Sequence, residues 1–86
     1  MTERALTILY FAWLRERIGV PRETVTTSAS TVSELVAELR AREDRYAMAF
    51  ADTNAVRVAL DQDLRDFAAP LDGVREVAFF PPMTGG

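Results

Sequence analysis

The chain has 86 residues, 49% of them hydrophobic and 27% charged, which fits one small folded domain and leaves no room for a separate catalytic domain. It contains neither cysteine nor histidine, which excludes disulfides, thiolate nucleophiles, zinc fingers and histidine-based catalysis. Its 10 basic residues are all arginine and stand against 13 acidic residues, so the net charge of -3 offers no basic field for nucleic acid.

An apolar run near the start predicts a buried strand rather than a targeting segment. The run at residues 5–14 (ALTILYFAWL) is much shorter than the roughly 20 apolar residues that a membrane-spanning helix needs. Arg15 to Arg17 follow where a signal peptide requires small residues. We therefore expect a cytoplasmic protein that does not bind membranes.

The first predicted strand covers residues 6–11. Alternation along a strand places successive side chains on opposite faces of the sheet. Leu9 and Phe11 therefore share a face with Thr7, and we expect both to lie near water. The opposite face, toward the core, carries Leu6, Ile8 and Tyr10.

A short helix over residues 13–18 is predicted next, because Gly19 can close it in the left-handed conformation and Pro21 prevents its continuation. Residues 23–27 then have the composition of a second strand.

The clearest local signal is a capping box at Thr31 and Glu34. The Thr31 hydroxyl can accept from the N3 amide, and the Glu34 carboxylate can reach back to the amide of the cap residue. We expect a helix over residues 31–42, with an ion pair between Glu38 and Arg42. Its apolar stripe consists of Val32, Leu35, Val36 and Leu39.

The second half of the chain alternates short strands and turns. Residues 45–50 remain open between a helix and irregular packing. A strand over residues 56–60 ends at Asp61 and Asp63, for which a solvated turn is favoured over a metal pair. Two further strands are predicted at residues 64–67 and 76–80.

This order of elements predicts an α+β fold of the β-grasp (ubiquitin-like) type, with a mixed sheet covered by one main helix. Residues 1–80 form the domain and residues 81–86 an extended tail. Pro81 and Pro82 prevent the last strand from continuing and stiffen the exit of the chain.

The tail ends in Gly85 and Gly86, which have no side chains, so the terminal carboxylate can enter a channel too narrow for other residues. A frayed end is the alternative, because two terminal glycines also arise by chance. A compact domain followed by a proline-stiffened exit favours a functional tail.

Four segments resemble the small subunit of molybdopterin synthase, a family of ubiquitin-like sulfur carriers in molybdenum cofactor biosynthesis. The strongest is VAFFPPMTGG at residues 77–86, supported by residues 8–19, 30–39 and 44–50. Residues 72–76 depart from the family, in which this turn is more acidic.

The resemblance implies that the chain is not an enzyme on its own and holds no cofactor or metal. An adenylating enzyme of the ubiquitin-activating type would use ATP and Mg²⁺ to convert the Gly86 carboxylate to an acyl-adenylate. A persulfide donor would then leave a thiocarboxylate. A large synthase subunit, in a 2+2 heterotetramer, would use this sulfur to build the dithiolene of molybdopterin from cyclic pyranopterin monophosphate.

The family's docking residues fall on Phe11, Leu64 and Phe80, with Arg15 as a possible ion-pairing partner. Phe80 alternates with Phe79 and should point outward, beside Phe11 if the first and last strands are neighbours. The tail residues Pro81, Pro82, Thr84 and Gly85 would thread into the partner. The alternative is that local loops cover the aromatic side chains and that Arg15 is solvated.

Three other functions remain open. A protein modifier of the ubiquitin type would form an isopeptide bond through Gly86, although a chain without lysine cannot polymerise through its own side chains. A sulfur carrier for thiazole synthesis would share the tail chemistry. A purely structural β-grasp module would not need the last two glycines.

Overall fold

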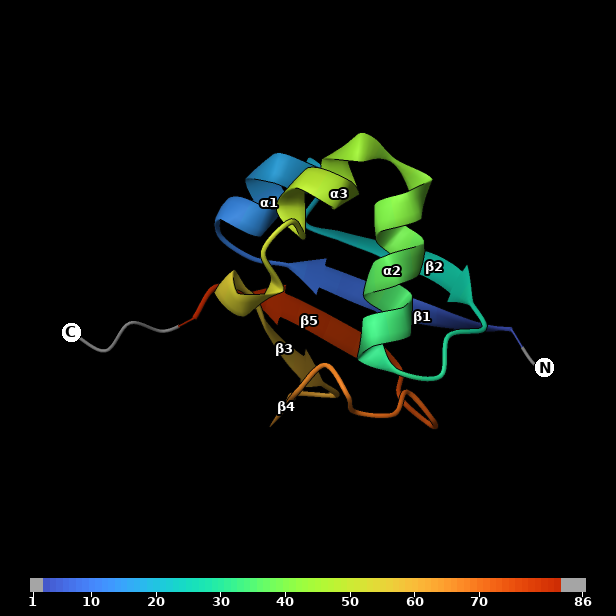
Figure 1. Ribbon diagram of the computed structural model, residues 1–86. Helices are drawn as coiled ribbons and strands as arrows, with labels where there is room; N and C mark the ends of the chain where they lie inside the picture. Colours follow the sequence, from blue (N-terminus) through green and yellow to red (C-terminus); the bar gives the residue numbers. More distant parts are fainter. Residues whose placement is uncertain (1–2, 83–86) are drawn as a thin grey trace.

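The computed structural model describes residues 3–82, and its five strands form one sheet in the order β2-β1-β5-β3-β4 (Figure 1). The strands are β1 (Arg4–Tyr10), β2 (Arg22–Thr27), β3 (Arg57–Leu60), β4 (Asp63–Arg65) and β5 (Glu76–Phe80). The helices are α1 (Trp13–Ile18), α2 (Val32–Arg42), α3 (Asp44–Ala49) and the 3-10 turn η1 (Thr53–Ala55).

The first and last strands are neighbours. β1 pairs in parallel with β5, whereas the pairs β1–β2, β3–β4 and β3–β5 are antiparallel. A parallel pair brings the carboxyl ends of its two strands to the same edge, so β1 and β5 end side by side (Figure 1). The mixed sheet confirms the predicted β-grasp fold.

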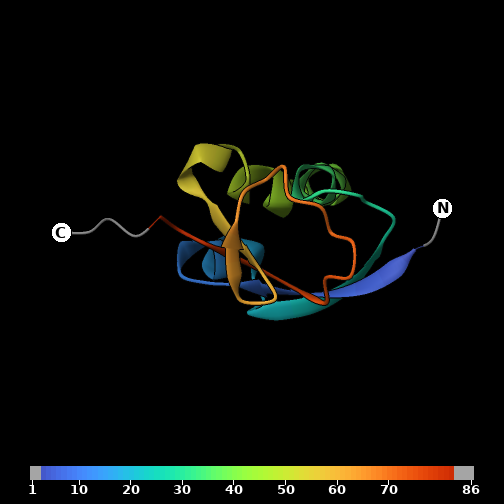
Figure 2. The ribbon, with the colours of Figure 1, turned by 90° about the horizontal axis from the view of Figure 1, so that it is seen from below.

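The core lies between the sheet and the helices α2 and α3, which cover one side of it (Figure 2). Phe79 occupies its centre, with its ring centroid 4.9 Å from that of Phe50 and 6.2 Å from that of Tyr10. The predicted apolar stripe and its partners in the sheet are all buried: Val32, Leu35, Val36, Leu39, Leu6, Ile8, Tyr10, Val56, Val58, Val77 and Phe79.

Of the two hydrogen bonds expected in the capping box of α2, one forms as predicted and the other has a different donor. Thr31 Oγ1 accepts from the Glu34 backbone N–H at 3.2 Å, as predicted. The Glu34 carboxylate instead accepts from the N–H of Ser30, at 2.8 Å, one residue before the cap. Thr31 is extended and bridges to Pro70, which gives the segment before the helix its direction.

The predicted ion pair between Glu38 and Arg42 is wrong for the described part of the chain. Glu38 Oε1 accepts a hydrogen bond from Thr27 Oγ1 at 2.6 Å. Thr27 is buried, and a buried hydroxyl without an acceptor would cost about 1–3 kcal/mol, more than an exposed pair contributes.

Residues 45–50, ambiguous in the sequence, form most of α3 and its C-terminal cap. Tyr46 and Phe50 lie four residues apart and are both buried against the sheet. Tertiary packing of these two rings therefore decides the helical conformation.

Four polar side chains join α3 to the sheet and are called here the tyrosine network: Tyr10, Glu23, Arg45 and Tyr46. One carboxylate oxygen of Glu23 accepts from the hydroxyls of Tyr46 at 2.6 Å and Tyr10 at 2.7 Å. The Arg45 guanidinium lies 4.9 Å from the centroid of the Tyr46 ring and donates to the Ile18 carbonyl at 2.7 Å. The network ties α1, α3, β1 and β2 together.

The turn between β3 and β4 is exposed, as predicted, and is built by Asp61 and Gln62 in the left-handed region, with φ of 49° and 74°. The strand after it covers residues 63–65 rather than 64–67. It ends early because the Asp66 carboxylate accepts from the Ala68 N–H at 2.9 Å and turns the chain.

Candidate functional site

The side of the sheet opposite α2, here called the open face, carries a row of apolar residues. Leu9 pairs with Ala78, Ala78 with Ala59, and Ala59 with Leu64. Directly paired residues project to the same side, and their neighbours along the strands, such as Ile8 and Val77, are buried on the helix side. The row therefore crosses four strands on the face that none of the described helices covers.

A shallow apolar hollow of about 520 Å³ lies at the edge where β1 and β5 end, and is called here the exit hollow. The parallel pairing of these strands creates it, and the Phe11 N–H extends that pairing by donating to the Phe79 carbonyl at 3.1 Å. Its lining residues are Phe11, Ala12, Ala78, Phe80, Pro81 and Pro82. The hollow thus surrounds the point at which the tail leaves the domain.

The structure brings together Phe11 and Phe80, two of the predicted docking residues. Phe11 is 46% exposed, and Phe80, half-buried, lines the same hollow. Leu64, 70% exposed, lies on the same face but on the edge strand β4, two strands from β5. Arg15 is exposed on α1 and does not line the hollow. Their binding roles stay predictions, and the geometry gives them a shared apolar surface.

The predicted tail begins where expected. β5 ends at Phe80, because the two prolines that follow lack the amide donor that a further ladder bond requires. Pro81 and Pro82 line the exit hollow. Thr84, Gly85 and Gly86 lie outside the described residues.

The residue after Phe11 has a strained backbone. Ala12 has φ 55° and ψ -132°, a backbone conformation that residues with a Cβ rarely adopt. Such a residue costs of order 1–3 kcal/mol and persists only where its surroundings hold it. The turn directs the chain from β1 into α1 and leaves the Phe11 ring outside the core. Nothing in the sequence signalled this conformation, because alanine has no preference for it.

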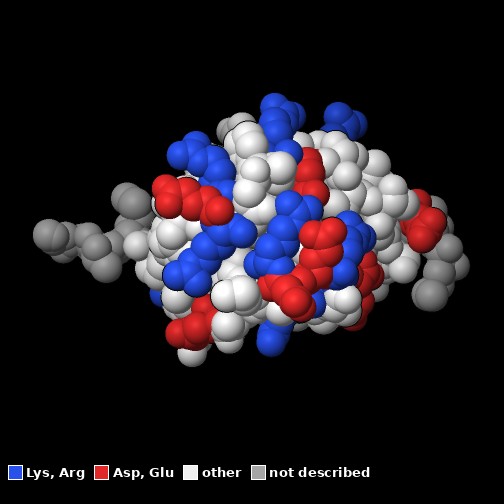
Figure 3. Space-filling view, turned by 90° about the horizontal axis from the view of Figure 1, so that it is seen from above, with Lys and Arg blue, Asp and Glu red and all other residues white. Residues whose placement is uncertain are grey.

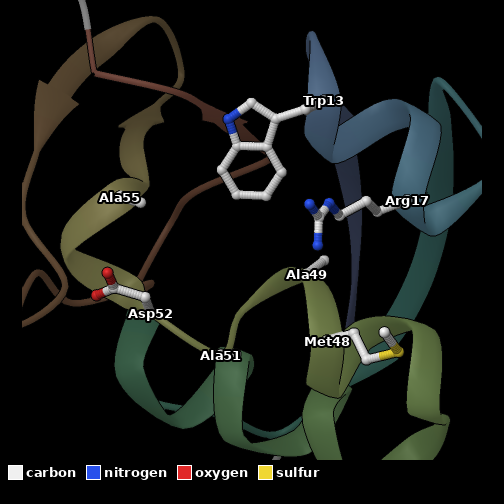
Figure 4. A pocket seen from close by; sticks show the side chains of 7 residues that line it. All are labelled: Trp13, Arg17, Met48, Ala49, Ala51, Asp52 and Ala55. Atoms are coloured by element: carbon white, nitrogen blue, oxygen red, sulfur yellow. The ribbon is translucent and has the colours of Figure 1, made fainter.

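A second hollow, of about 490 Å³, lies between α1, α3 and η1 and was not predicted. Trp13 and Arg17 point into it from α1, and the Arg17 guanidinium lies 5.4 Å from the Trp13 ring centroid (Figure 4). The remaining lining residues are Met48, Ala49, Ala51, Asp52 and Ala55. Arg17 and Asp52 are its charged groups, a composition that suits contact more than acid–base chemistry.

Residues 3–82 contain no group of three acidic side chains placed to hold a metal ion. The described tyrosines show the clearest perturbation: burial, and then the hydrogen bond to Glu23, raise the pKa of Tyr46 to about 12 and raise that of Tyr10 as well. Both belong to the tyrosine network and stay protonated at neutral pH.

Among the described helices, none is long and apolar enough to cross a membrane.

The chain is similar to known proteins over nearly its whole length. The model of the ThiS family matches residues 8–86. A molybdopterin synthase sulfur carrier subunit from Escherichia coli (strain K12) is 40% identical over 79 residues, which cover 92% of this chain and 96% of that protein.

Two solved structures share the fold over nearly their whole length. SAMP1 from Haloferax volcanii has a TM-score of 0.75 at 19% identity, covering 96% of this chain and 100% of that one, a likeness that shows the fold alone. A chain in the complex of subunits 1 and 2 of the molybdopterin-converting factor from Helicobacter pylori 26695 has a TM-score of 0.59 at 25% identity, covering 96% and 100%.

Proposed function

The chain belongs to the ThiS family, among the molybdopterin synthase sulfur carrier subunits, and we propose that it carries sulfur as a thiocarboxylate on the terminal carbon of Gly86. The observation that carries the proposal is the exit hollow, an apolar surface at the point where the chain leaves the sheet toward Gly86. A domain of this kind docks on a partner and delivers its tail.

Loading the tail needs a second protein. A terminal carboxyl has a pKa of about 3.5 and is ionised at neutral pH. It can therefore attack the phosphorus atom of a phosphate group, but its own carbon is a poor electrophile. In the proposal, an adenylating enzyme joins Gly86 to the α-phosphate of ATP, with Mg²⁺, and releases pyrophosphate. A persulfide sulfur then attacks the acyl carbon and AMP leaves. Reductive cleavage of the resulting acyl disulfide by a thiol leaves the thiocarboxylate.

The loaded tail needs no neighbouring base. A thiocarboxylate shares its charge between sulfur and oxygen, so it is anionic at neutral pH, whereas a free cysteine must have its pKa lowered to become nucleophilic. This explains how a chain without cysteine can carry sulfur.

Docking on the large synthase subunit uses the open face and the exit hollow. Ordering the tail in a channel costs conformational entropy, which the burial of exposed apolar side chains offsets. Phe11 and Leu64 expose 46% and 70% of their surface, so both have apolar area to bury. The subunit complex from Helicobacter pylori supports a partner of this kind, and we propose a 2+2 heterotetramer for this chain.

The catalytic site lies in the large subunit in this proposal. There the thiocarboxylate sulfur displaces an oxygen substituent from a carbon of cyclic pyranopterin monophosphate, so that a C–S bond forms as a C–O bond breaks. Hydrolysis of the acyl–sulfur bond then returns the Gly86 carboxylate. Two carriers supply the two dithiolene sulfurs. Because loading in this proposal consumes ATP, we place the cycle in the cytoplasm.

Reconstitution tests the proposal. The carrier, an adenylating enzyme, ATP, Mg²⁺, a persulfide donor, a thiol reductant and the large subunit are mixed with cyclic pyranopterin monophosphate. We expect molybdopterin to form, and we expect none from a variant lacking Gly86 that keeps the wild-type circular dichroism spectrum. Equal product from both proteins would refute the role of the terminal carbon. Thiol-resistant conjugates with other proteins, and no molybdopterin, would favour a ubiquitin-like modifier.

A further inference from the structure

The open face carries few charges, and their distribution is uneven. Pairing places Arg22 of β2 opposite Leu9, Arg57 of β3 opposite Phe80, and Glu76 of β5 opposite Thr7. Leu9 and Phe80 lie toward the edge where the tail leaves, and Thr7 lies toward the other edge. The described strands therefore present two arginines and no carboxylate on the half of the open face next to the exit hollow.

This sign is opposite to that of the whole chain, whose net charge is -3. Elsewhere the charges are mixed: on the side formed by α1 and α3, basic and acidic side chains are interspersed (Figure 3). Because the protein as a whole is acidic, it does not attract anions in general. A small basic region on it therefore favours recognition of one specific partner.

The two arginines lie on opposite sides of the apolar residues. β1 and β5 lie between β2 and β3, so Arg22 and Arg57 are three strand spacings apart across the sheet. Pairing brings Arg22 level with Ala59, and Arg57 lies two residues from Ala59 along β3. Standard sheet geometry makes this roughly 16 Å between their Cα atoms. Arg22 and Arg57 are exposed, and together they are called here the rim. Arg57 Nη1 donates to the carbonyls of Asn54 and Val56 at 3.1 and 3.2 Å, which orders its guanidinium beside the turn that precedes β3.

We propose that Arg22 and Arg57 select the large synthase subunit by meeting two carboxylates that lie on either side of an apolar centre on that partner. The inference rests on the proposed function and adds the chemistry of the complementary surface. The partner's carboxylates should lie on opposite sides of that centre, as the two arginines do across the sheet, where their Cα atoms are roughly 16 Å apart.

Rim charges of this kind act mainly on the rate of association. Opposite charges steer the encounter and set the register, and salt screens them because the Debye length is about 8 Å at physiological ionic strength. The apolar residues between them should control dissociation instead. The two contributions can therefore be separated by kinetics.

The test compares two double charge reversals in the full-length carrier. Arg22→Glu with Arg57→Glu changes the rim, and Arg40→Glu with Arg42→Glu makes the same change in net charge on exposed positions of α2, on the other side of the sheet. Association with the purified large subunit is followed by stopped-flow fluorescence at low and high salt. Circular dichroism melts monitor folding, and Arg22→Glu alone serves as a milder rim variant.

We expect the rim variant to associate about 10-fold more slowly at low salt, with a weaker salt dependence, while the α2 variant stays within about two-fold of wild type. Arg22→Glu alone should give an intermediate rate. Equal slowing of both double variants, or slowing only toward the adenylating enzyme, would overturn the inference.

Phe11→Ala separates this inference from the proposed function. If Phe11→Ala speeds dissociation from the large subunit and the rim variant behaves like the α2 variant, the inference fails and the docking proposal stands. If the wild-type carrier does not bind the large subunit, the inference and the docking proposal both fail.

Discussion

Asp61 and Glu76 are joined by two hydrogen bonds across the end of the sheet. The Asp61 carboxylate accepts from the Glu76 N–H at 2.9 Å, and the Asp61 N–H donates to the Glu76 carbonyl at 2.9 Å. The same carboxylate also accepts from the Arg75 N–H at 3.1 Å. The turn that carries β4, and with it Leu64, is thereby fixed to the start of β5, the strand that ends at the tail.

Replacement of Asp61 should loosen this end of the sheet. Asp61→Ala removes the acceptor and places alanine at φ 49°, so we expect unfolding free energy to fall by about 2 kcal/mol. Asp61→Asn should lose less than half of that, because asparagine tolerates the left-handed region and its side-chain oxygen can accept. Urea denaturation measures both, and equal losses would show that the carboxylate acts only through its charge.

The tyrosine network should make the fold sensitive to alkaline pH. The pKa of Tyr46 is about 12 in the folded state, against about 10 unfolded, and that of Tyr10 is also raised. A raised pKa contributes stability that is fully present below pH 10 and is lost as pH rises toward the folded value. Unfolding free energy should fall above pH 10, by up to about 1.4 kcal/mol per pH unit for each tyrosine.

Absorbance near the phenolate band reports on this directly, because Tyr10 and Tyr46 are the only tyrosines of the chain. Neither should ionise near pH 10 while the circular dichroism spectrum stays native, and both should do so in urea. Tyr46→Phe should lower stability at pH 7 and reduce the alkaline slope. A phenolate signal at pH 10 in the native protein would contradict the assignment.

Exposed apolar residues on the open face should matter for binding and little for folding. Phe11→Ala and Leu64→Ala should each weaken the complex with the large subunit by about 10-fold, since truncating an interface anchor costs more than about 1 kcal/mol. Met48→Ala is the matched control, because Met48 is 65% exposed but lies on α3. Isothermal titration calorimetry compares the three, and a Met48 effect as large as that of Phe11 would move the docking site.

The alternation of β1 and β5 was sufficient to predict which side chains face outward. Leu9, Phe11 and Phe80 lie on the open face because their neighbours, among them Phe79, are needed in the core. Gly19 likewise closes α1 in the left-handed conformation, at φ 97°, as its sequence context predicts. These features depend on local chemistry, which one sequence contains.

Features that depend on distant partners were missed. The Tyr46 hydroxyl donates to the Glu23 carboxylate, 23 residues away in the sequence. Glu38 accepts from Thr27 instead of pairing with Arg42, one helical turn away. In both cases tertiary packing decides which partner lies near. The hollow beside Trp13 also arises from the approach of three separate segments. No local pattern encodes these approaches.

The central claim is that the terminal carbon of Gly86 is the sulfur attachment site, and intact-mass spectrometry tests it most directly. The carrier is incubated with an adenylating enzyme, ATP, Mg²⁺, a persulfide donor and a thiol reductant. The account predicts the mass increase of one oxygen replaced by sulfur, located in the C-terminal peptide and absent from a variant without Gly86. An unchanged mass, under conditions in which pyrophosphate is released in amounts equal to the carrier, would contradict it.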